Sequence, residues 1–217
     1  MVFGGSMANL RGKYIVAVLV ATVLASCGGG GQSPTETPDP PPNPTPQTEP
    51  VAMRSAMSDL LDFYANPISY TTLSQIPTTG SARYTGYLSG ELSNSSDTIP
   101  DSLIANLTID VEFGATTFVA SGQATNFFDD ANEPVTGSLV LAVGQLDRSG
   151  NPNDDATFTM TADGQLTTAG GDQFDISSRL EGDFLGAQHN ALGGAALGRA
   201  TAGGQLQDFD GSFIAAR

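Results

Sequence analysis

Residues 103–113 carry the pattern that most restricts the fold of this chain, because apolar and polar side chains alternate along them. Five of the six residues at odd positions are large and apolar, whereas four of the five at even positions are polar. A period of two places these side chains on opposite faces of an extended strand, so one face lies in a core. Seven further runs of this kind, separated by Gly, Asn and Asp turn residues, lie at residues 82–91, 116–127, 135–146, 156–161, 173–180, 192–200 and 205–215. The sequence therefore predicts eight strands.

These strands predict a mainly β protein in which residues 80–217 form a single eight-stranded antiparallel β-barrel. The 26 glycines and 13 prolines disfavour long helices, and a meander that closes on itself leaves no free edge. A barrel of this size is only wide enough for its own side chains, so we expect a filled interior. The residues expected to fill it are Leu107, Ile109, Val111, Phe113, Leu139, Leu141, Phe158, Phe174, Ile176 and Phe213. Glycines inside the strands predict bends or bulges, at Gly86, Gly122, Gly137, Gly182 and Gly194.

The N-terminus has the features of a secretory signal peptide. Arg11 and Lys13 precede an apolar run at residues 14–25. This run is shorter than the roughly 20 residues that a membrane-spanning helix needs. It ends in LASC, which resembles a bacterial lipobox, with the only cysteine, Cys27, at the position that receives diacylglycerol. We therefore expect a lipoprotein signal peptide at residues 1–26; the alternative is an ordinary cysteine after a conventional cleavage site.

Acylation would attach the mature chain to outer-membrane lipid through Cys27. Two or three acyl chains make a durable anchor. Gly28 follows the cysteine, whereas an aspartate there would resemble the signal that retains lipoproteins in the inner membrane of many Gram-negative bacteria. We therefore expect a lipid-anchored outer-membrane protein exposed at the cell surface, with the periplasmic face of that membrane as the alternative.

Two segments separate the expected anchor from the barrel. Residues 27–50 are rich in glycine and proline and contain no large apolar side chain, which predicts a disordered tether. Apolar side chains then recur with helical spacing between residues 53 and 64, and Asn66-Pro67 predicts the end of that helix. Residues 51–79 are therefore expected to form one short helix and a lead-in, with the helix packed outside the barrel or across an opening.

The charge balance excludes one large class of partner. Acidic residues outnumber basic ones by 23 to 8, and the formal net charge is −15. A nucleic-acid interface needs several cations to neutralise phosphates, so we expect no nucleic-acid partner. A strongly acidic surface instead favours basic proteins or cations through long-range attraction.

No motif for catalysis, a cofactor or a metal stands out in the sequence. The single histidine, His189, falls in an expected turn, and the chain contains no G-x-S-x-G, P-loop, dinucleotide fingerprint or C-x-x-C. We therefore expect a protein that is not an enzyme and that holds no resident cofactor or metal. His189 is interpreted as a solvent-exposed loop residue, with axial ligation of heme iron as the alternative.

Two expected loops are dense in oxygen-bearing side chains. They contain Asp129, Asp130, Asn132 and Glu133 in the first loop and Asn151, Asn153, Asp154 and Asp155 in the second. Such oxygens suit Ca²⁺, but neither loop has EF-hand spacing, and turn capping with solvation explains both loops without a metal. Because rigid scaffolds carry binding residues on their loops, we expect these two loops to form the contact surface for a partner.

Several short motifs resemble those of a known family. They are IPTTGSARYTG at residues 76–86, DVEFG at 110–114, GDFLGAQ at 182–188, ALGG at 191–194 and GSFIAAR at 211–217. This series is similar to the β-barrel domain of the transferrin-binding protein B family of surface lipoproteins. Relatives of that family include factor H-binding protein-like barrels and heme- or haemoglobin-binding barrels.

The resemblance implies a lipid-anchored, non-catalytic bacterial surface binding protein. Such a protein captures a host or environmental protein, or an iron or heme complex, through its barrel loops. The resemblance carries over no particular ligand, because family partners are bound through variable loops, and one barrel stands here where full transferrin receptors have two lobes. The alternative is a structural or immune-exposed outer-membrane lipoprotein without a dedicated small ligand.

Overall fold

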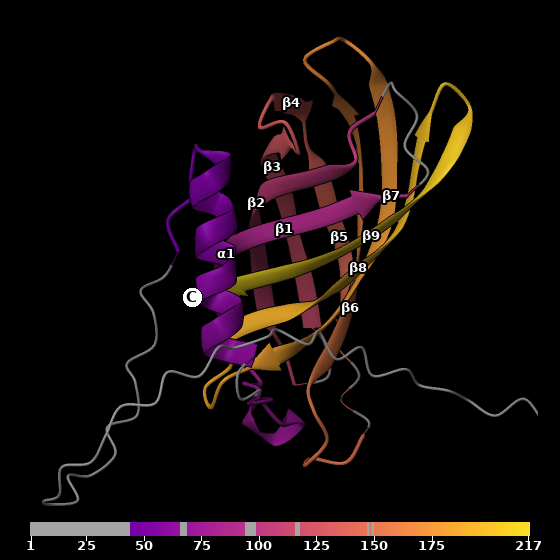
Figure 1. Cartoon of the computed structure of the whole chain (residues 1–217). Helices are drawn as coiled ribbons and strands as arrows, with labels where there is room; N and C mark the ends of the chain where they lie inside the picture. Colours follow the sequence, from indigo (N-terminus) through magenta and orange to yellow (C-terminus); the bar gives the residue numbers. More distant parts are fainter. Residues whose placement is uncertain (1–43, 66–68, 94–98, 116–117, 147, 149) are drawn as a thin grey trace, which may run out of the picture. The chain divides into compact units, whose positions relative to one another are not determined.

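A β meander occupies the chain from Ser81 to its end (Figure 1). The computed structural model describes residues 44–65, 69–93, 99–115, 118–146, 148 and 150–217. The strands are β1 (Ser81–Leu92), β2 (Ser102–Phe113), β3 (Phe118–Asp129), β4 (Pro134–Gly137), β5 (Leu139–Leu146), β6 (Thr157–Thr167), β7 (Gln173–Leu185), β8 (Ala191–Ala202) and β9 (Gln205–Ala216). Neighbouring strands pair antiparallel around the sheet, and β9 pairs back with β1, which closes it. The expected mainly β barrel is confirmed.

The short strands β4 and β5 together form one wall position of this barrel. Both lie between β3 and β6 and pair with them. They are separated only by Ser138, and Gly137 before it has a φ of 117°, in the region that favours glycine. The barrel therefore has the eight strand positions that the sequence predicts, with one position divided between β4 and β5.

Strand β6 extends further than the sequence indicates. The sequence predicts a run at residues 156–161, whereas the strand continues to Thr167. A Cβ at Gly164 would collide with the carbonyl oxygen of Ser138, between β4 and β5. This glycine therefore permits a close approach of two strands and does not end one.

The predicted bulges lie elsewhere than at the predicted glycines. The register shifts fall between Ile104 and Asn106 in the β2–β3 pair and between Ala142 and Gln145 in the β5–β6 pair. At Gly86, Gly122 and Gly194 a Cβ would instead collide with the main chain of the adjacent strand. No bulge lies at these glycines, since the strand register runs through them without a shift; the absence of a side chain serves close strand packing there.

The barrel interior is filled by side chains, as expected. All ten predicted interior residues are at most 7% exposed. The Phe184 ring lies 5.6–6.3 Å, centroid to centroid, from the rings of Tyr84, Phe113, Phe118 and Phe158. This aromatic cluster fills one end of the barrel, which we call the base; it carries the β2–β3, β5–β6 and β7–β8 connections. The other end, which carries the β3–β4, β6–β7 and β8–β9 turns, is called the hairpin end.

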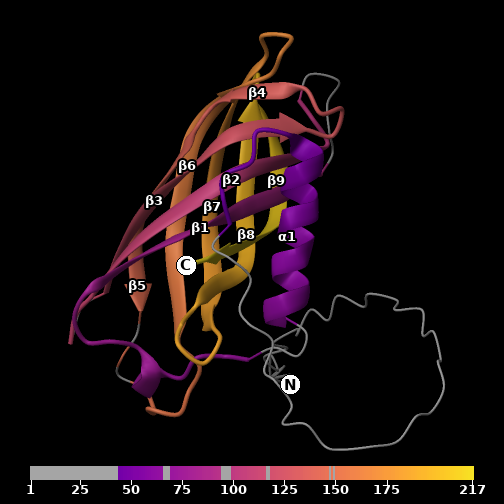
Figure 2. The same ribbon diagram turned by 90° about the vertical axis from the view of Figure 1, so that its left-hand side faces the viewer.

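The helix α1 (Pro50–Ala65) lies along the outside of the barrel wall (Figure 2). Met53, Met57, Leu60 and Tyr64 recur on its inner face and form a buried cluster with outward-facing residues of the wall. Those wall residues are Tyr87, Ile104, Leu185, Ala191, Ile214 and Ala216. The structure thus decides between the two expected positions of the helix, and the apolar patch that it covers belongs to the outer surface of the barrel.

The end of the expected tether differs from the prediction of disorder through residue 50. Residues 44–49 lie against the wall, where Asn106 and Thr85 form hydrogen bonds with them, and Pro50 already begins the helix. Composition could not predict this order, because the bonds come from side chains far along the chain. The rest of the tether and the signal peptide lie outside the described residues.

A short segment closes the base. Residues 69–76, which include the 3-10 helix η1 (Leu73–Gln75), cross from the helix side to β1, and Tyr70 and Thr72 form β-bridges with Leu185 and Asp155. The Thr71 N–H donates to the Phe184 carbonyl at 2.8 Å, and the Thr71 carbonyl accepts from Ala156 at 2.9 Å. We call residues 69–76 the base segment.

Candidate functional site

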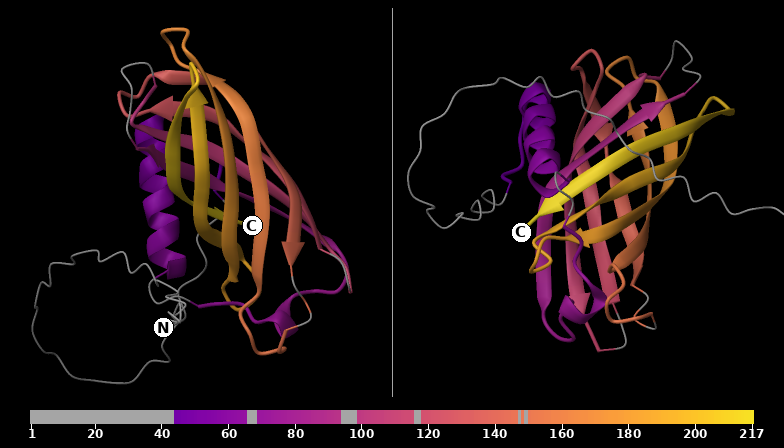
Figure 3. Two further views of the ribbon diagram at one scale, coloured as in Figure 1. Left: turned by 90° about the vertical axis from the view of Figure 1, so that its right-hand side faces the viewer. Right: turned by 60° about the horizontal axis from the view of Figure 1, so that its bottom comes forward.

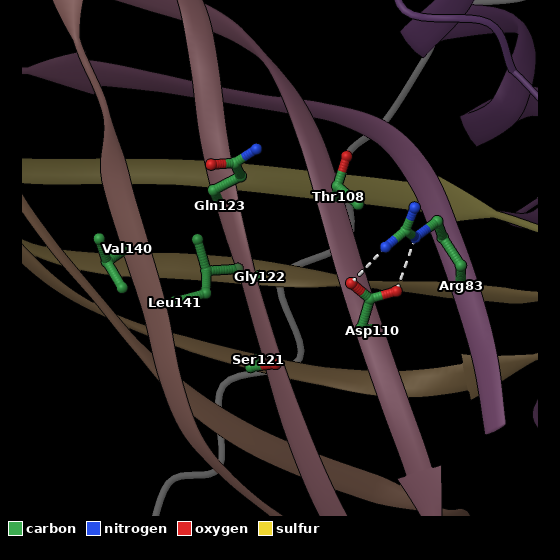
Figure 4. A pocket seen from close by; sticks show the side chains of 8 residues that line it. All are labelled: Arg83, Thr108, Asp110, Ser121, Gly122, Gln123, Val140 and Leu141. Carbon is green, nitrogen blue, oxygen red and sulfur yellow. Dashed lines mark hydrogen bonds and ion pairs between the residues drawn. The ribbon is translucent and has the colours of Figure 1, made fainter.

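A shallow hollow of about 420 Å³ opens on the outer wall of β1, β2, β3 and β5 (Figure 4). Its lining consists of Arg83, Thr108, Asp110, Ser121, Gly122, Gln123, Val140 and Leu141. Thr108 and Ser121 supply hydroxyl groups and Gln123 an amide, and a Cβ at Gly122 would collide with the Thr108 carbonyl. Hydroxyl and amide groups therefore surround a patch of main chain, with Val140, 60% exposed, at one edge.

An ion pair forms one side of the hollow. The Arg83 guanidinium donates from Nε to Asp110 Oδ1 at 2.7 Å and from Nη2 to Oδ2 at 2.9 Å. Hydrogen bonding from Arg83 lowers the pKa of the Asp110 carboxyl, so this group stays ionised and is unsuited to act as a general acid. Both side chains are well exposed, so the pair adds little stability and remains open to a charged partner.

The first predicted loop lies at the hairpin end and is tied to the helix. Arg54 donates to Asn132 Oδ1 at 2.6 Å and to the Asp129 carbonyl at 2.9 Å. Asp129 Oδ1 accepts from the Glu133 N–H at 2.7 Å, and Asp130 Oδ1 accepts from the Asp101 N–H at 3.2 Å. These oxygens cap turns and anchor α1, which agrees with the turn-capping interpretation.

The second predicted loop lies at the base. Asn151 Oδ1 accepts from the Asn153 N–H at 2.9 Å, and Asp154 Oδ2 accepts from the Asn151 N–H at 3.1 Å. The Asp154 carbonyl accepts from the Leu73 N–H at 3.0 Å, and Asp155 forms a bridge with Thr72. This loop therefore holds the base segment in place.

The two loops do not form one contact surface, contrary to the sequence prediction. Successive connections of an up-and-down barrel alternate between its ends, and the β3–β4 and β5–β6 connections are successive (Figure 3). Asp129, Asp130, Asn132 and Glu133 thus lie at the opposite end from Asn151, Asn153, Asp154 and Asp155. The hollow was missed because its residues come from four strands, and only their pairing register brings them together.

His189 is buried, so its interpretation as a solvent-exposed loop residue was wrong. Its side chain is 8% exposed in the β7–β8 turn, its ring meets the edge of Phe113 at 5.5 Å, and its carbonyl accepts from the Tyr84 hydroxyl at 2.9 Å. Burial, aided by the positive charge of Arg217, lowers the pKa of His189 to about 4. Packing against Phe113 leaves the ring little room for the axial ligation of heme iron.

A second ionisable group at the base carries a shifted pKa that the sequence does not reveal. Burial raises the pKa of Asp183 to about 6, and the nearby negative charge of Asp155 adds to the shift. Tyr70 of the base segment shares this environment, since burial and the same two carboxylates raise its pKa. The shift arises because the base segment covers the β7 strand where Asp183 faces outward.

Within the ranges that the structure describes, no group of three or more His, Cys, Asp or Glu side chains is placed to hold a metal ion. No helix in the same ranges combines the length and apolarity needed to cross a membrane. Cys27 lies outside the described residues, so its acylation stays a prediction.

Comparisons with protein-family models, curated proteins and solved structures find no match to this chain. The resemblance to the transferrin-binding protein B family therefore stays a prediction from the motifs.

Proposed function

We propose that this chain is a lipid-anchored, non-catalytic binding protein of the bacterial outer membrane that captures a protein, or an iron or heme complex, on the outer wall of its barrel. The observation that carries the proposal is the filled interior, which leaves a ligand only the outer surface. On that surface the hollow combines an ion pair, hydroxyl and amide groups, and the exposed Val140. Such a mixture is typical of specific recognition sites.

The anchor is the part of the proposal that rests on the sequence alone. The basic n-region, the short apolar run and the lipobox-like LASC support acylation of Cys27. Cys27→Ser should release the protein from the membrane fraction and abolish incorporation of labelled palmitate. Unchanged fractionation together with unchanged labelling would remove the anchor from the proposal.

The charge of the chain favours a basic partner or a cationic complex. With a net charge of −15, long-range attraction raises the encounter rate with positively charged molecules and repels acidic ones. The motif resemblance supports capture at the cell surface, and the periplasmic face remains the alternative location. We expect binding to weaken strongly as ionic strength rises.

The capture test uses residues 44–217 against heme, haemoglobin and iron-carrier proteins. Val140→Arg places a long charged side chain in the hollow, and Leu197→Arg is the matched control, because Leu197 is 45% exposed on another part of the wall. We expect at least about a tenfold loss of affinity for Val140→Arg alone. Equal losses in both variants would place binding elsewhere, and no binding below about 100 μM would favour the structural or immune-exposed envelope lipoprotein.

A further inference from the structure

Residues 44–47 run along the outer wall and are held there through their main-chain atoms. The Gln47 N–H donates to Asn106 Oδ1 at 3.1 Å, and Asn106 Nδ2 donates to the Gln47 carbonyl at 2.7 Å. Asn126 Nδ2 donates to the same carbonyl at 2.9 Å. One side-chain amide thus engages both the donor and the acceptor of a single residue, as a neighbouring strand would.

Two hydroxyl groups extend this contact along the segment. Thr85 Oγ1 donates to the Pro44 carbonyl at 2.8 Å, and the Tyr87 hydroxyl donates to the Thr45 carbonyl at 3.3 Å. These contacts, like those of the two asparagines, reach atoms that every peptide carries. The Gln47 side chain adds a hydrogen bond with Tyr87, so the recognition combines several main-chain contacts with one side-chain contact.

Local irregularities of the barrel place the two asparagines. The β2–β3 register passes from Ile104 opposite Phe128 to Asn106 opposite Thr125, so β3 carries an extra residue at this point. Asn126 lies in that bulge with a φ of 56°, a conformation that is costly for most residues. A bulge re-aims the side chain that it carries, and this one turns the Asn126 amide to the Gln47 carbonyl. Asn106 beside it is only 9% exposed under the segment.

The segment borders the hollow. Thr85, which holds Pro44, pairs across the β1–β2 register with Thr108, which lines the hollow. Thr108 in turn pairs with Gln123, another lining residue. The main-chain contacts and the hollow therefore occupy adjoining parts of one face.

We propose that Thr85, Tyr87, Asn106 and Asn126 form a peptide-binding site that binds the main chain of an extended segment. Residues 44–47 are its resident ligand, and an extended segment of a partner protein binds there in competition with them. The inference rests on the proposed function for the existence of a partner, and it names that partner's binding mode. A ligand on the same chain has an effective concentration in the millimolar range. The resident segment therefore lowers the apparent affinity for any partner segment.

The test compares two forms of the domain, residues 44–217 and residues 48–217. The shorter form loses all five of these hydrogen bonds to the main chain but keeps the Glu49 carbonyl that accepts from the Met53 N–H. It loses no buried side chain, because both core clusters begin at Met53 or later. The probe is a capped synthetic peptide, NPTPQT, corresponding to residues 43–48, and binding is followed by amide chemical-shift changes.

We expect the peptide to bind the shorter form at the wall of β1–β3 and the longer form at least about tenfold more weakly. Methylation of the peptide nitrogen corresponding to Gln47 should abolish binding, since it removes the donor to Asn106. Alanine in place of the threonine at 45 should change affinity by less than about threefold, whereas alanine in place of the glutamine at 47 should weaken binding further because it removes the hydrogen bond with Tyr87. Asn106→Asp should weaken binding about tenfold, whereas Asn153→Asp at the base, a matched change, should not.

Absence of binding to a cooperatively folded 48–217 domain at about 5 mM peptide would overturn the inference, as would equal binding of the methylated peptide. If the shorter form does not fold, hydrogen exchange in residues 44–217 replaces it. Asn106→Leu, which removes the acceptor of the Gln47 N–H, should then speed exchange of that amide at least about tenfold, and an unchanged rate would overturn the inference. Peptide binding without any captured partner would instead count against the proposed function alone.

Discussion

The two ends of the barrel differ in how far they cover their ionisable side chains. At the hairpin end, Asp129, Asp130 and Glu133 lie on a turn whose oxygens cap main-chain N–H groups in reach of water. At the base, the base segment and the aromatic cluster bury His189 and cover Asp183, and the pKa values of both are displaced toward the neutral forms. Similar ionisable residues thus acquire different properties from what is packed over them, because burial penalises charge.

The largest expected effect is the loss of stability when a buried side chain is truncated, and it should differ between the two ends of the barrel. Phe184→Ala removes the ring at the centre of the basal aromatic cluster and should lower the free energy of unfolding by about 3–5 kcal/mol. Val135→Ala at the hairpin end, where Val135 is also buried, should cost only about 1–2 kcal/mol because a smaller cavity forms. Urea unfolding at neutral pH measures both, and equal losses would contradict the unequal packing.

The second prediction concerns the stability of the folded protein at acid pH. His189 has a pKa of about 4 in the folded protein against about 6.5 unfolded, so between these values the unfolded state binds the proton. Stability should therefore fall by about 2–3 kcal/mol as pH drops from 6.5 to 4. His189→Asn removes this titration and tolerates the positive φ of 49°. Parallel stability–pH curves for the two proteins would contradict the lowered pKa of His189 in the folded protein.

For Asp183 we expect the opposite of His189: the folded state binds the proton more tightly than the unfolded state. Its pKa is raised to about 6, so the folded protein carries an unfavourable carboxylate above pH 6 and takes up a proton as pH falls. Asp183→Asn should stabilise the protein by about 1–2 kcal/mol at pH 7, a figure reduced for the carboxylate's partial contact with water, and should have no effect near pH 4. Glu133→Gln removes one charge at the hairpin end as the control. The same gain in both variants would indicate a general charge effect.

The fold was predictable because alternation is a local property of the chain. In residues 103–113 the pattern alone assigns Leu107 and Ile109 to the interior, and both are buried. The break at Ser138 and the full length of β6 were not predictable, since Gly137 and Gly164 take their roles from strands that approach them in space.

The site residues were less predictable for a related reason. His189 was expected to be exposed because turns usually are, but the Phe113 ring and the Tyr84 hydroxyl that bury it lie more than 70 residues away. In the sequence, Asn106 is one polar residue among others on a strand face. In the structure, the β3 bulge and residues 44–47 surround it. Pairing register and covering segments, which the sequence does not display, create both environments.

The smallest predicted effect returns to the hairpin end. Arg54 on α1 donates to Asn132 and to the Asp129 carbonyl, and both contacts are near the surface. Arg54→Ala should therefore lower the free energy of unfolding by only about 1 kcal/mol, while amide exchange in residues 130–133 rises several-fold because the turn loses its tie to the helix. Hydrogen exchange at the base should not change, because no contact of Arg54 reaches it among the described residues. A loss comparable to that of Phe184→Ala would contradict the near-surface position of these contacts.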